Sequence, residues 1–148
     1  MKDCLLIGPF AATWYKGTTE LLITQELKLG YDRYGRCQAL LFTEPNGNEK
    51  EVQATWYTTL NVNRPEYERF VPTEVYDDTK YKRYDNLDAI EVKPYNKLPK
   101  NYDGLIGVGF VFFYFYPELD YEIVEKRGDL KIDGKRLFYR LIIRRLKK

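Results

Sequence analysis

The sequence contains no histidine, only two cysteines and a single methionine. Without histidine, the Ser-His and Cys-His nucleophile pairs, the imidazole zinc ligands and the commonest acid-base catalyst at neutral pH are excluded. Cys4 and Cys37 are too few for a disulfide framework, and the N-terminal residues lack a signal-peptide cleavage pattern. We therefore expect a cytoplasmic protein.

Long hydrophobic runs are also missing, since a transmembrane helix needs about 20 apolar residues. The longest apolar run, residues 105–116, is shorter, contains two glycines and predicts a buried strand. The remaining composition, 16% aromatic and 31% charged, is typical of a soluble globular protein. We expect residues 1–148 to form a single domain with no membrane segment.

The charge is unevenly distributed along the chain. Seven of the last fourteen residues are basic and none is acidic, whereas the rest of the chain holds 17 basic and 22 acidic residues. A basic end on an acidic body suits a phosphate backbone or an acidic partner surface. It is equally typical of an edge strand that lysine and arginine protect from pairing.

Residues 1–60 predict a strand, a helix and a hairpin. The strand covers residues 5–7 and stops at Gly8-Pro9. The helix covers residues 18–26, with Thr18 or Thr19 as its N-cap, and residues 27–29 either finish it or begin a strand. The hairpin pairs two arms, residues 37–43 and 52–58, around the Asn-Gly turn at residues 46–47.

Residues 61–88 are polar and predict a long loop, and residues 89–148 predict further strands. A turn is predicted at Asp133-Gly134. The strands are expected at 89–92, 105–116, 121–125, 130–132 and 136–143. The predicted fold class is thus α/β, with a mixed, mainly antiparallel sheet and one or two helices in a single domain.

Two of these strands carry patterns that bear on function. Both faces of the segment 105–116 are apolar, which favours a central strand, although its aromatic side chains could instead stack on nucleobases. Strict alternation in the last strand places Leu137, Tyr139, Leu141 and Ile143 on a core face and Arg136, Arg140 and Arg144 on the other.

The polar loop holds both acidic and basic candidates. Paired carboxylates at Asp77-Asp78, and at Glu66 with Glu68, could perform acid-base catalysis, but a solvated loop explains them better. The cations of this loop are better candidates for contacts with phosphate groups. They are Arg64, Arg69, Lys80, Lys82 and Arg83.

Several segments resemble, in the same order, the C-terminal part of EcoRI-type adenine-specific DNA methyltransferases. The most specific are residues 84–92, which begin with Tyr84-Asp85-Asn86, and residues 101–108, in which Tyr102-Asp103-Gly104 precedes Leu105-Ile106-Gly107-Val108. Weaker matches cover residues 5–8, 17–31, 55–60 and 132–145. At residues 109–117 the family typically continues with a polar loop, whereas this chain is aromatic, which suggests packing surface.

Two parts of that family are missing from these 148 residues. They contain no Asn-Pro-Pro-Phe motif to hold the target adenine, and no Gly-rich strand-to-helix turn to receive S-adenosylmethionine. The resemblance therefore implies a fold derived from the C-terminal half of a methyltransferase, without catalytic, cofactor-binding or metal-binding residues. S-adenosylmethionine is expected only if a partner subunit supplies it.

The resemblance implies a methyltransferase fragment that binds double-stranded DNA or a separate methyltransferase subunit and is inactive by itself. The strand at residues 5–7 would lack its former parallel neighbour, and this unpaired apolar edge predicts association with another subunit or self-association. The residues expected to contact DNA or a partner are Trp56, Arg64, Arg69, Lys82, Arg83, Arg136, Arg140 and Arg144. Trp56 is a core residue in the competing interpretation.

A second hypothesis comes from a different class of protein. The methyltransferase remnant could serve as a non-enzymatic anti-defence protein of a phage or other mobile element, which binds a host nuclease or restriction system. The rebuilt aromatic segment and the basic end motivate this alternative, whose partner would be a host defence protein.

Overall fold

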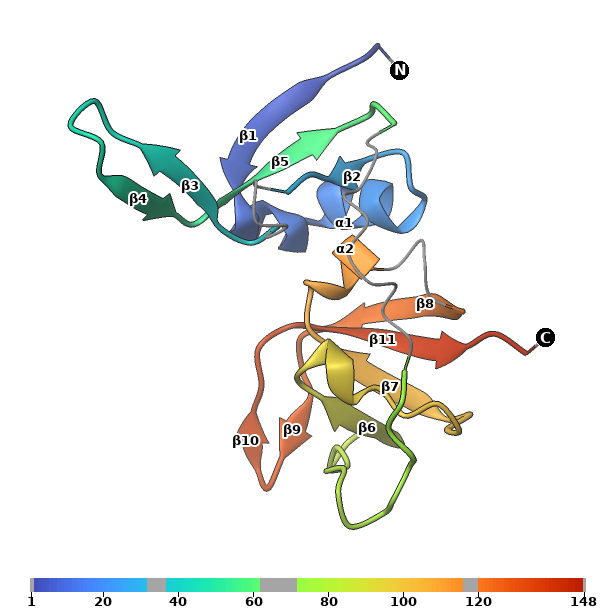
Figure 1. The fold of residues 1–148 in the computed structure, drawn as a ribbon. Coiled ribbons are helices and arrows are strands. Elements are labelled where there is room, and N and C mark those ends of the chain that lie inside the picture. Colours follow the sequence, from blue (N-terminus) through green and yellow to red (C-terminus); the bar gives the residue numbers. More distant parts are fainter. Residues whose placement is uncertain (1, 32–36, 62–71, 116–119, 148) are drawn as a thin grey trace. The chain divides into compact units, whose positions relative to one another are not determined.

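The computed structural model describes residues 2–31, 37–61, 72–115 and 120–147. The chain divides into two compact units, residues 1–68 (unit 1) and 69–148 (unit 2), with the boundary inside the polar segment 61–88. Each unit combines short helices with mainly antiparallel strands (Figure 1), so the predicted α/β class is confirmed. The single domain over residues 1–148 stays a prediction. None of the described helices is long and apolar enough to cross a membrane.

Unit 1 is built on a three-stranded antiparallel sheet with the order β1-β5-β2. Strand β1 (Leu5–Pro9) pairs along its whole length with β5 (Ala54–Thr58), so that Ile7 lies opposite Trp56. The short strand β2 (Lys28–Leu29) pairs with the other edge of β5. β1 is therefore an edge strand, and the alternative that residues 27–29 begin a strand is confirmed.

The 3-10 helix η1 (Phe10–Trp14) and the helix α1 (Lys16–Ile23) follow β1. The predicted N-cap was wrong, because the cap residue is Tyr15 and both threonines lie inside the helix. Thr19 is buried and its hydroxyl donates to the carbonyl oxygen of Thr13 at 2.6 Å. The Thr19 hydroxyl therefore has its hydrogen-bond partner inside the fold and does not cap the helix.

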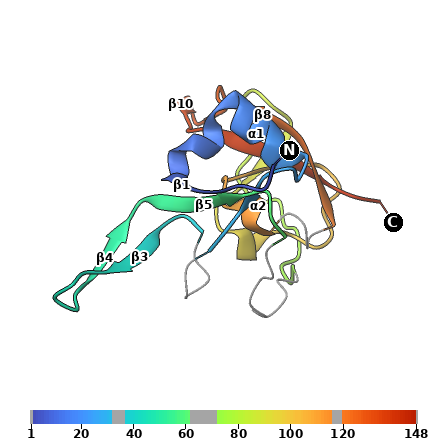
Figure 2. The ribbon, with the colours of Figure 1, turned by 90° about the horizontal axis from the view of Figure 1, so that it is seen from above.

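The predicted hairpin is present, but its second arm was placed too far along the chain. Strand β3 (Leu40–Thr43) pairs with β4 (Glu49–Val52), and Gly47 takes a φ of +86°, which favours glycine. Figure 2 shows this hairpin extending from the rest of unit 1. Its second arm is the exposed segment Glu49–Val52, whereas residues 54–58, all buried except the half-buried Trp56, form β5 and belong to the other sheet.

Unit 2 contains a four-stranded sheet with the order β6-β7-β11-β8 and a separate small hairpin. β6 (Ala89–Val92) and β7 (Leu105–Val108) are parallel, while β11 (Arg140–Arg145) is antiparallel to both β7 and β8 (Tyr121–Arg127). The hairpin joins β9 (Lys131–Ile132) and β10 (Lys135–Arg136), and η2 (Tyr95–Lys97) follows β6. The core includes side chains with 0% exposure, namely Ile90, Ile106, Leu141, Ile142 and Ile143.

The long strand predicted over residues 105–116 was wrong. β7 ends at Val108, and the aromatic residues form a helical turn, α2 (Phe112–Phe115). Phe110, Phe112 and Phe113 are all buried, and the rings of Phe110 and Phe113 lie 5.6 Å apart. A strand would send alternate rings to opposite faces, whereas a turn brings residues three apart together. Burial of these rings supports the packing interpretation over nucleobase stacking.

The last predicted strand, residues 136–143, is in fact two strands. Residues 137–139 lie between β10 and β11, and the pairing of β11 with β8 shifts register between Ile142 and Ile143. The extra residue of this bulge is Val124 of β8, since Ile142 lies opposite Glu125 and Ile143 lies opposite Ile123, so β11 itself keeps its alternation of faces. Leu141, Ile142 and Ile143 are all buried, so both faces of β11 are covered. The predicted core face is confirmed at Leu141 and Ile143 but wrong at Tyr139, which is 40% exposed, and the other face is not purely basic because Ile142 is buried there.

The polar loop is confirmed where the structure describes it. Residues 72–88 contain no helix or strand, only isolated bridges from Glu74 to Pro99 and from Arg83 to Ile90. Residues 62–71 lie outside the described part of the chain.

Candidate functional site

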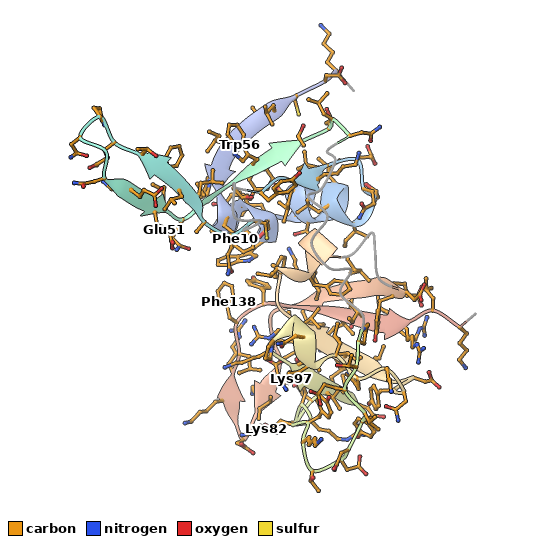
Figure 3. The ribbon with its side chains drawn as sticks, viewed as in Figure 1. Phe10, Glu51, Trp56, Lys82, Lys97 and Phe138 are labelled. Carbon is orange, nitrogen blue, oxygen red and sulfur yellow. The ribbon has the colours of Figure 1, made fainter. Side chains whose placement is uncertain are left out.

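A basic cleft of about 480 Å³ lies within unit 2. One side comes from the loop at residues 80–82 and the C-terminal end of β6, and the other from the hairpin β9–β10. Figure 3 labels Lys82 beside this hairpin. The lining residues are Lys80, Lys82, Glu91, Lys93, Ile132, Asp133, Lys135 and Leu137.

The motif Tyr84-Asp85-Asn86 holds the hairpin that forms one wall of this cleft. The Asp85 carboxylate accepts hydrogen bonds from the backbone N–H groups of Asp133 at 3.2 Å and Gly134 at 2.8 Å. Asn86 donates from its side-chain amide to the carbonyl of Asp129 at 2.9 Å and accepts from the N–H of Lys131 at 3.1 Å. The motif therefore acts as a clamp on a tight turn.

That turn has the backbone conformation predicted from Asp133-Gly134. Both residues have positive φ, 52° and 75°, which a two-residue hairpin turn of type I′ requires. The turn directs Lys135 and Asp133 into the cleft lining.

The first residue of the motif belongs to a buried polar cluster. The Tyr84 hydroxyl donates to the Glu91 carboxylate, which also accepts from Arg140, with Nε 2.9 Å from Oε1 and Nη2 2.9 Å from Oε1. The side chains of Arg140 and Glu91 are only 13% and 8% exposed. Burial, and then the hydrogen bond to Glu91, raise the pKa of Tyr84 far above its usual value, so its hydroxyl stays protonated.

Gly107 gives the Tyr84 ring its place in this cluster. A Cβ added at Gly107 would overlap the ring and hydroxyl of Tyr84. The glycine of the Leu-Ile-Gly-Val segment therefore serves close packing between β7 and the clamp.

The structure gives most of the predicted contact residues an ion-pair or hydrogen-bond partner. Lys82 pairs with Asp133 at 3.4 Å, and Arg83 pairs with Asp88 at 2.7 Å. Arg144 pairs with Glu122 at 2.6 Å, and Arg136 donates to the carbonyl of Gly128 at 2.8 Å. Among the described cations that the sequence predicted for contacts with phosphate groups, DNA or a partner, Lys80 and Lys82 line the basic cleft. The contacts themselves stay predictions for the whole set.

The remaining predicted residues fall elsewhere. Arg64 and Arg69 lie outside the described residues. Trp56 is half-buried in β5, where its backbone carbonyl accepts from the N–H of Gly30 at 2.8 Å. A Cβ at Gly30 would stand 2.6 Å from Trp56 Cβ, so this glycine permits the close approach of the chain. Figure 3 labels Trp56 in unit 1.

The acidic candidates behave as loop residues. The Asp77 carboxylate accepts from the N–H and the hydroxyl of Thr79 at 2.8 and 2.7 Å, which is a local turn. Asp78 accepts from the hydroxyl of Tyr76, and Glu66 and Glu68 lie outside the described residues. Within the described ranges, no group of three or more cysteine, aspartate or glutamate side chains could hold a metal ion.

Sequence reasoning missed Lys93 and Lys135 as members of one site. Each is isolated among ordinary loop and strand residues, so no local motif marks either of them. The only available signal was that Lys135 follows the Asp-Gly turn directly, but its neighbours across the cleft depend on the tertiary structure.

The edge strand β1 of unit 1 is the second distinctive feature. Leu5, Leu6 and Ile7 are 55%, 59% and 50% exposed, which includes residues on both faces of the strand. Within the described residues, the outer edge of β1 has no strand partner. The unpaired apolar edge predicted from the sequence is therefore present.

Comparison with known proteins connects these features. Residues 1–142 match the family model of adenine-specific methyltransferase EcoRI. The type II methyltransferase M.EcoRI of Escherichia coli is 28% identical in an alignment of 166 positions that covers 97% of this chain and 50% of that protein. The type II methyltransferase M.MgeORF184P of Mycoplasma genitalium is 25% identical in an alignment of 158 positions that covers 89% of this chain and 49% of that protein. No solved structure gives a significant match.

The clamp, the Gly107 contact and the edge strand all lie inside the matched range. The chain spans about half the length of these two relatives. With residues 1–142 of 148 covered by one family model, the chain belongs to the EcoRI family of adenine-specific methyltransferases.

Proposed function

We propose that these 148 residues form the DNA- and partner-contacting portion of an adenine-specific DNA methyltransferase, corresponding to its C-terminal half. The observation that carries this proposal is the match of residues 1–142 to the family model. The alignments with the two relatives cover only about half of each relative. In this proposal, S-adenosylmethionine and the target adenine are bound by the other half of the enzyme, which corresponds to the part of the relatives that the present chain does not cover.

The edge strand β1 is the proposed docking surface for that donor-binding part. An edge strand with apolar side chains on both faces leaves backbone N–H and C=O groups unpaired and apolar area in water. Leu5, Leu6 and Ile7 are each at least half exposed. A neighbouring strand from the donor-binding part, covered on both faces, would satisfy both needs.

Methyl transfer provides the first test. The purified chain is incubated with tritiated S-adenosylmethionine and an adenine-containing duplex, and label in the DNA is counted. We expect no incorporation by the chain alone. Incorporation above a no-protein control would contradict the proposal that donor binding lies outside these residues.

Light scattering of the purified chain tests the docking surface. In the absence of the donor-binding part, the exposed edge should drive concentration-dependent self-association. Leu6→Lys places a charge on the edge and should return the chain to a monomer. Phe42→Lys is the matched control, since Phe42 is 41% exposed on the hairpin β3–β4 of the same unit. A monomeric wild type, or equal effects of both substitutions, would remove the support for β1.

DNA contact is tested by chromatography with light scattering, with and without the duplex, at two salt concentrations. A complex that weakens as salt rises would support phosphate contacts. Absence of any complex at low salt would restrict the proposal to a protein partner.

A further inference from the structure

We propose that the basic cleft of unit 2 binds a phosphate group of the DNA backbone, with the attached deoxyribose against Ile132 and Leu137. This inference rests on the proposed function, because it assigns the DNA contact of that function to one place in the fold. The two apolar residues are half-buried and line the cleft together with four lysines.

The charge of the cleft favours an anion. Its two carboxylates are already neutralised, since Glu91 pairs with the buried Arg140 and Asp133 pairs with Lys82. Lys93 and Lys135 are exposed, and neither forms an ion pair with any other described residue. Lys80 adds a third ammonium group, which also attracts the carboxylates of Asp77 and Glu74 in the same loop and helps to lower their pKa values.

The size and composition of the cleft suit one nucleotide unit. A volume of about 480 Å³ falls within the range of roughly 300–1,000 Å³ typical of small-ligand sites. Lysine binds phosphate as a point charge on a flexible stem, so it can follow a backbone without a fixed bidentate geometry. Apolar side chains between the cations offer contact to the sugar carbons.

The hairpin wall of the cleft is held in place before any ligand binds. Asp85 bonds to both residues of the turn, and Asn86 bonds to Asp129 just before β9 and to Lys131 at its start. Asp133 and Lys135 are therefore positioned by the clamp. A wall that is already ordered reduces the entropy that binding must otherwise remove.

Fluorescence anisotropy with a labelled duplex tests the cleft. Each lysine–phosphate contact contributes roughly eightfold to affinity at 0.1 M salt through counterion release. We expect Lys93→Gln/Lys135→Gln to bind the duplex up to about 60-fold more weakly and to lower the salt slope by about 2. Both side chains are exposed, so the fold should persist, which circular dichroism checks.

The matched control removes two charges from the same unit but outside the cleft. Lys100→Gln/Lys147→Gln changes two exposed lysines that do not line it. It should weaken binding several-fold less than the cleft variant. Equal losses for the two double variants, or wild-type affinity in the cleft variant, would overturn the cleft assignment while the wild-type complex still supports the proposed function.

A second probe separates the inference from the proposed function if the wild type binds no duplex. Deoxyadenosine 5′-monophosphate and inorganic phosphate are titrated while amide chemical shifts are followed by NMR. Shifts confined to residues around the cleft, and lost in the cleft variant, would support a phosphate site for a free nucleotide and refute the DNA contact. Absence of such shifts would overturn the phosphate site itself.

Discussion

Glu91→Gln is the substitution that tests the buried cluster of unit 2 most directly. It preserves the shape of the side chain but removes the negative charge that faces Arg140. Arg140 is 13% exposed, so its guanidinium would lose its counter-charge in a place that water barely reaches. The Tyr84 hydroxyl would lose a charged acceptor in the same step.

The expected cost can be derived from these contacts. Breaking a buried ion pair by removing one partner typically costs about 3–5 kcal/mol. Arg140 also donates from Nη1 to the carbonyls of Phe138 at 3.2 Å and Tyr139 at 3.1 Å, and these bonds survive the substitution. We therefore expect the lower end of the range, about 3 kcal/mol in the free energy of unfolding of unit 2.

Urea unfolding followed by far-ultraviolet circular dichroism measures this cost. Both tryptophans, Trp14 and Trp56, lie in unit 1, so their fluorescence reports that unit separately. The control is Arg144→Gln on the same strand β11, which breaks the pair with Glu122. Those side chains are 53% and 41% exposed, so the control should cost only about 0.5 kcal/mol.

The comparison between the two variants shows whether burial determines how much each ion pair contributes to the free energy of unfolding. A Glu91→Gln cost within about 0.5 kcal/mol of the Arg144→Gln cost would refute the reasoning, since both pairs have similar distances. A large shift in the tryptophan transition would show that the cluster also stabilises unit 1.

Burial raises the pKa of Tyr57 from 10.0 to about 12, so its stabilisation of unit 1 is complete below pH 10 and is lost as the pH rises towards 12. Tyr57→Phe should remove that pH dependence, measured by urea unfolding between pH 9 and pH 12, and an unchanged profile would contradict it. Asp85→Ala should cost roughly 1 kcal/mol and speed amide exchange at the β9–β10 turn; protection equal to wild type would exclude a clamp. Gly17→Ala, with open space around it in α1, should raise the melting temperature slightly, whereas Gly107→Ala should lower it by several degrees because of overlap. Equal melting temperatures for these two variants would refute the packing role of Gly107.

The sequence predicted correctly those elements that depend on residues within a few positions of one another. The strand β6 was predicted with its observed bounds, Ala89–Val92, and the turn at Asp133-Gly134 has the positive φ values that this dipeptide favours. The apolar edge at residues 5–7 was also predicted, because three successive apolar residues form the strand. In the described part of the chain these side chains remain at least half exposed.

Predictions failed where packing overrides periodicity. The aromatic run after β7 reads as a strand because both faces are apolar, yet burial of Phe110, Phe112 and Phe113 is achieved by a helical turn. In the inner strand β11, Leu141, Ile142 and Ile143 are all buried because both faces of the strand are covered, which the expected split into a core face and a basic face did not predict.

The candidate site shows the same limit. Lys80 and Lys82 were singled out from the sequence, but Lys93 and Lys135 join them only because the clamp brings the β9–β10 hairpin beside the end of β6. Arg140 carries the same charge and was predicted as a contact residue from its place on the strand, yet its guanidinium pairs with the Glu91 carboxylate.

By itself, the sequence determined the family, the α/β class, the lack of histidine chemistry and the strongest turns, because each depends on residue identity or on neighbours within a few positions. Only the tertiary structure decided which cations are available to a ligand and which are neutralised. An ion pair joins residues far apart in the chain, such as Arg140 and Glu91, and the burial that makes it strong exists only once the sheet has formed.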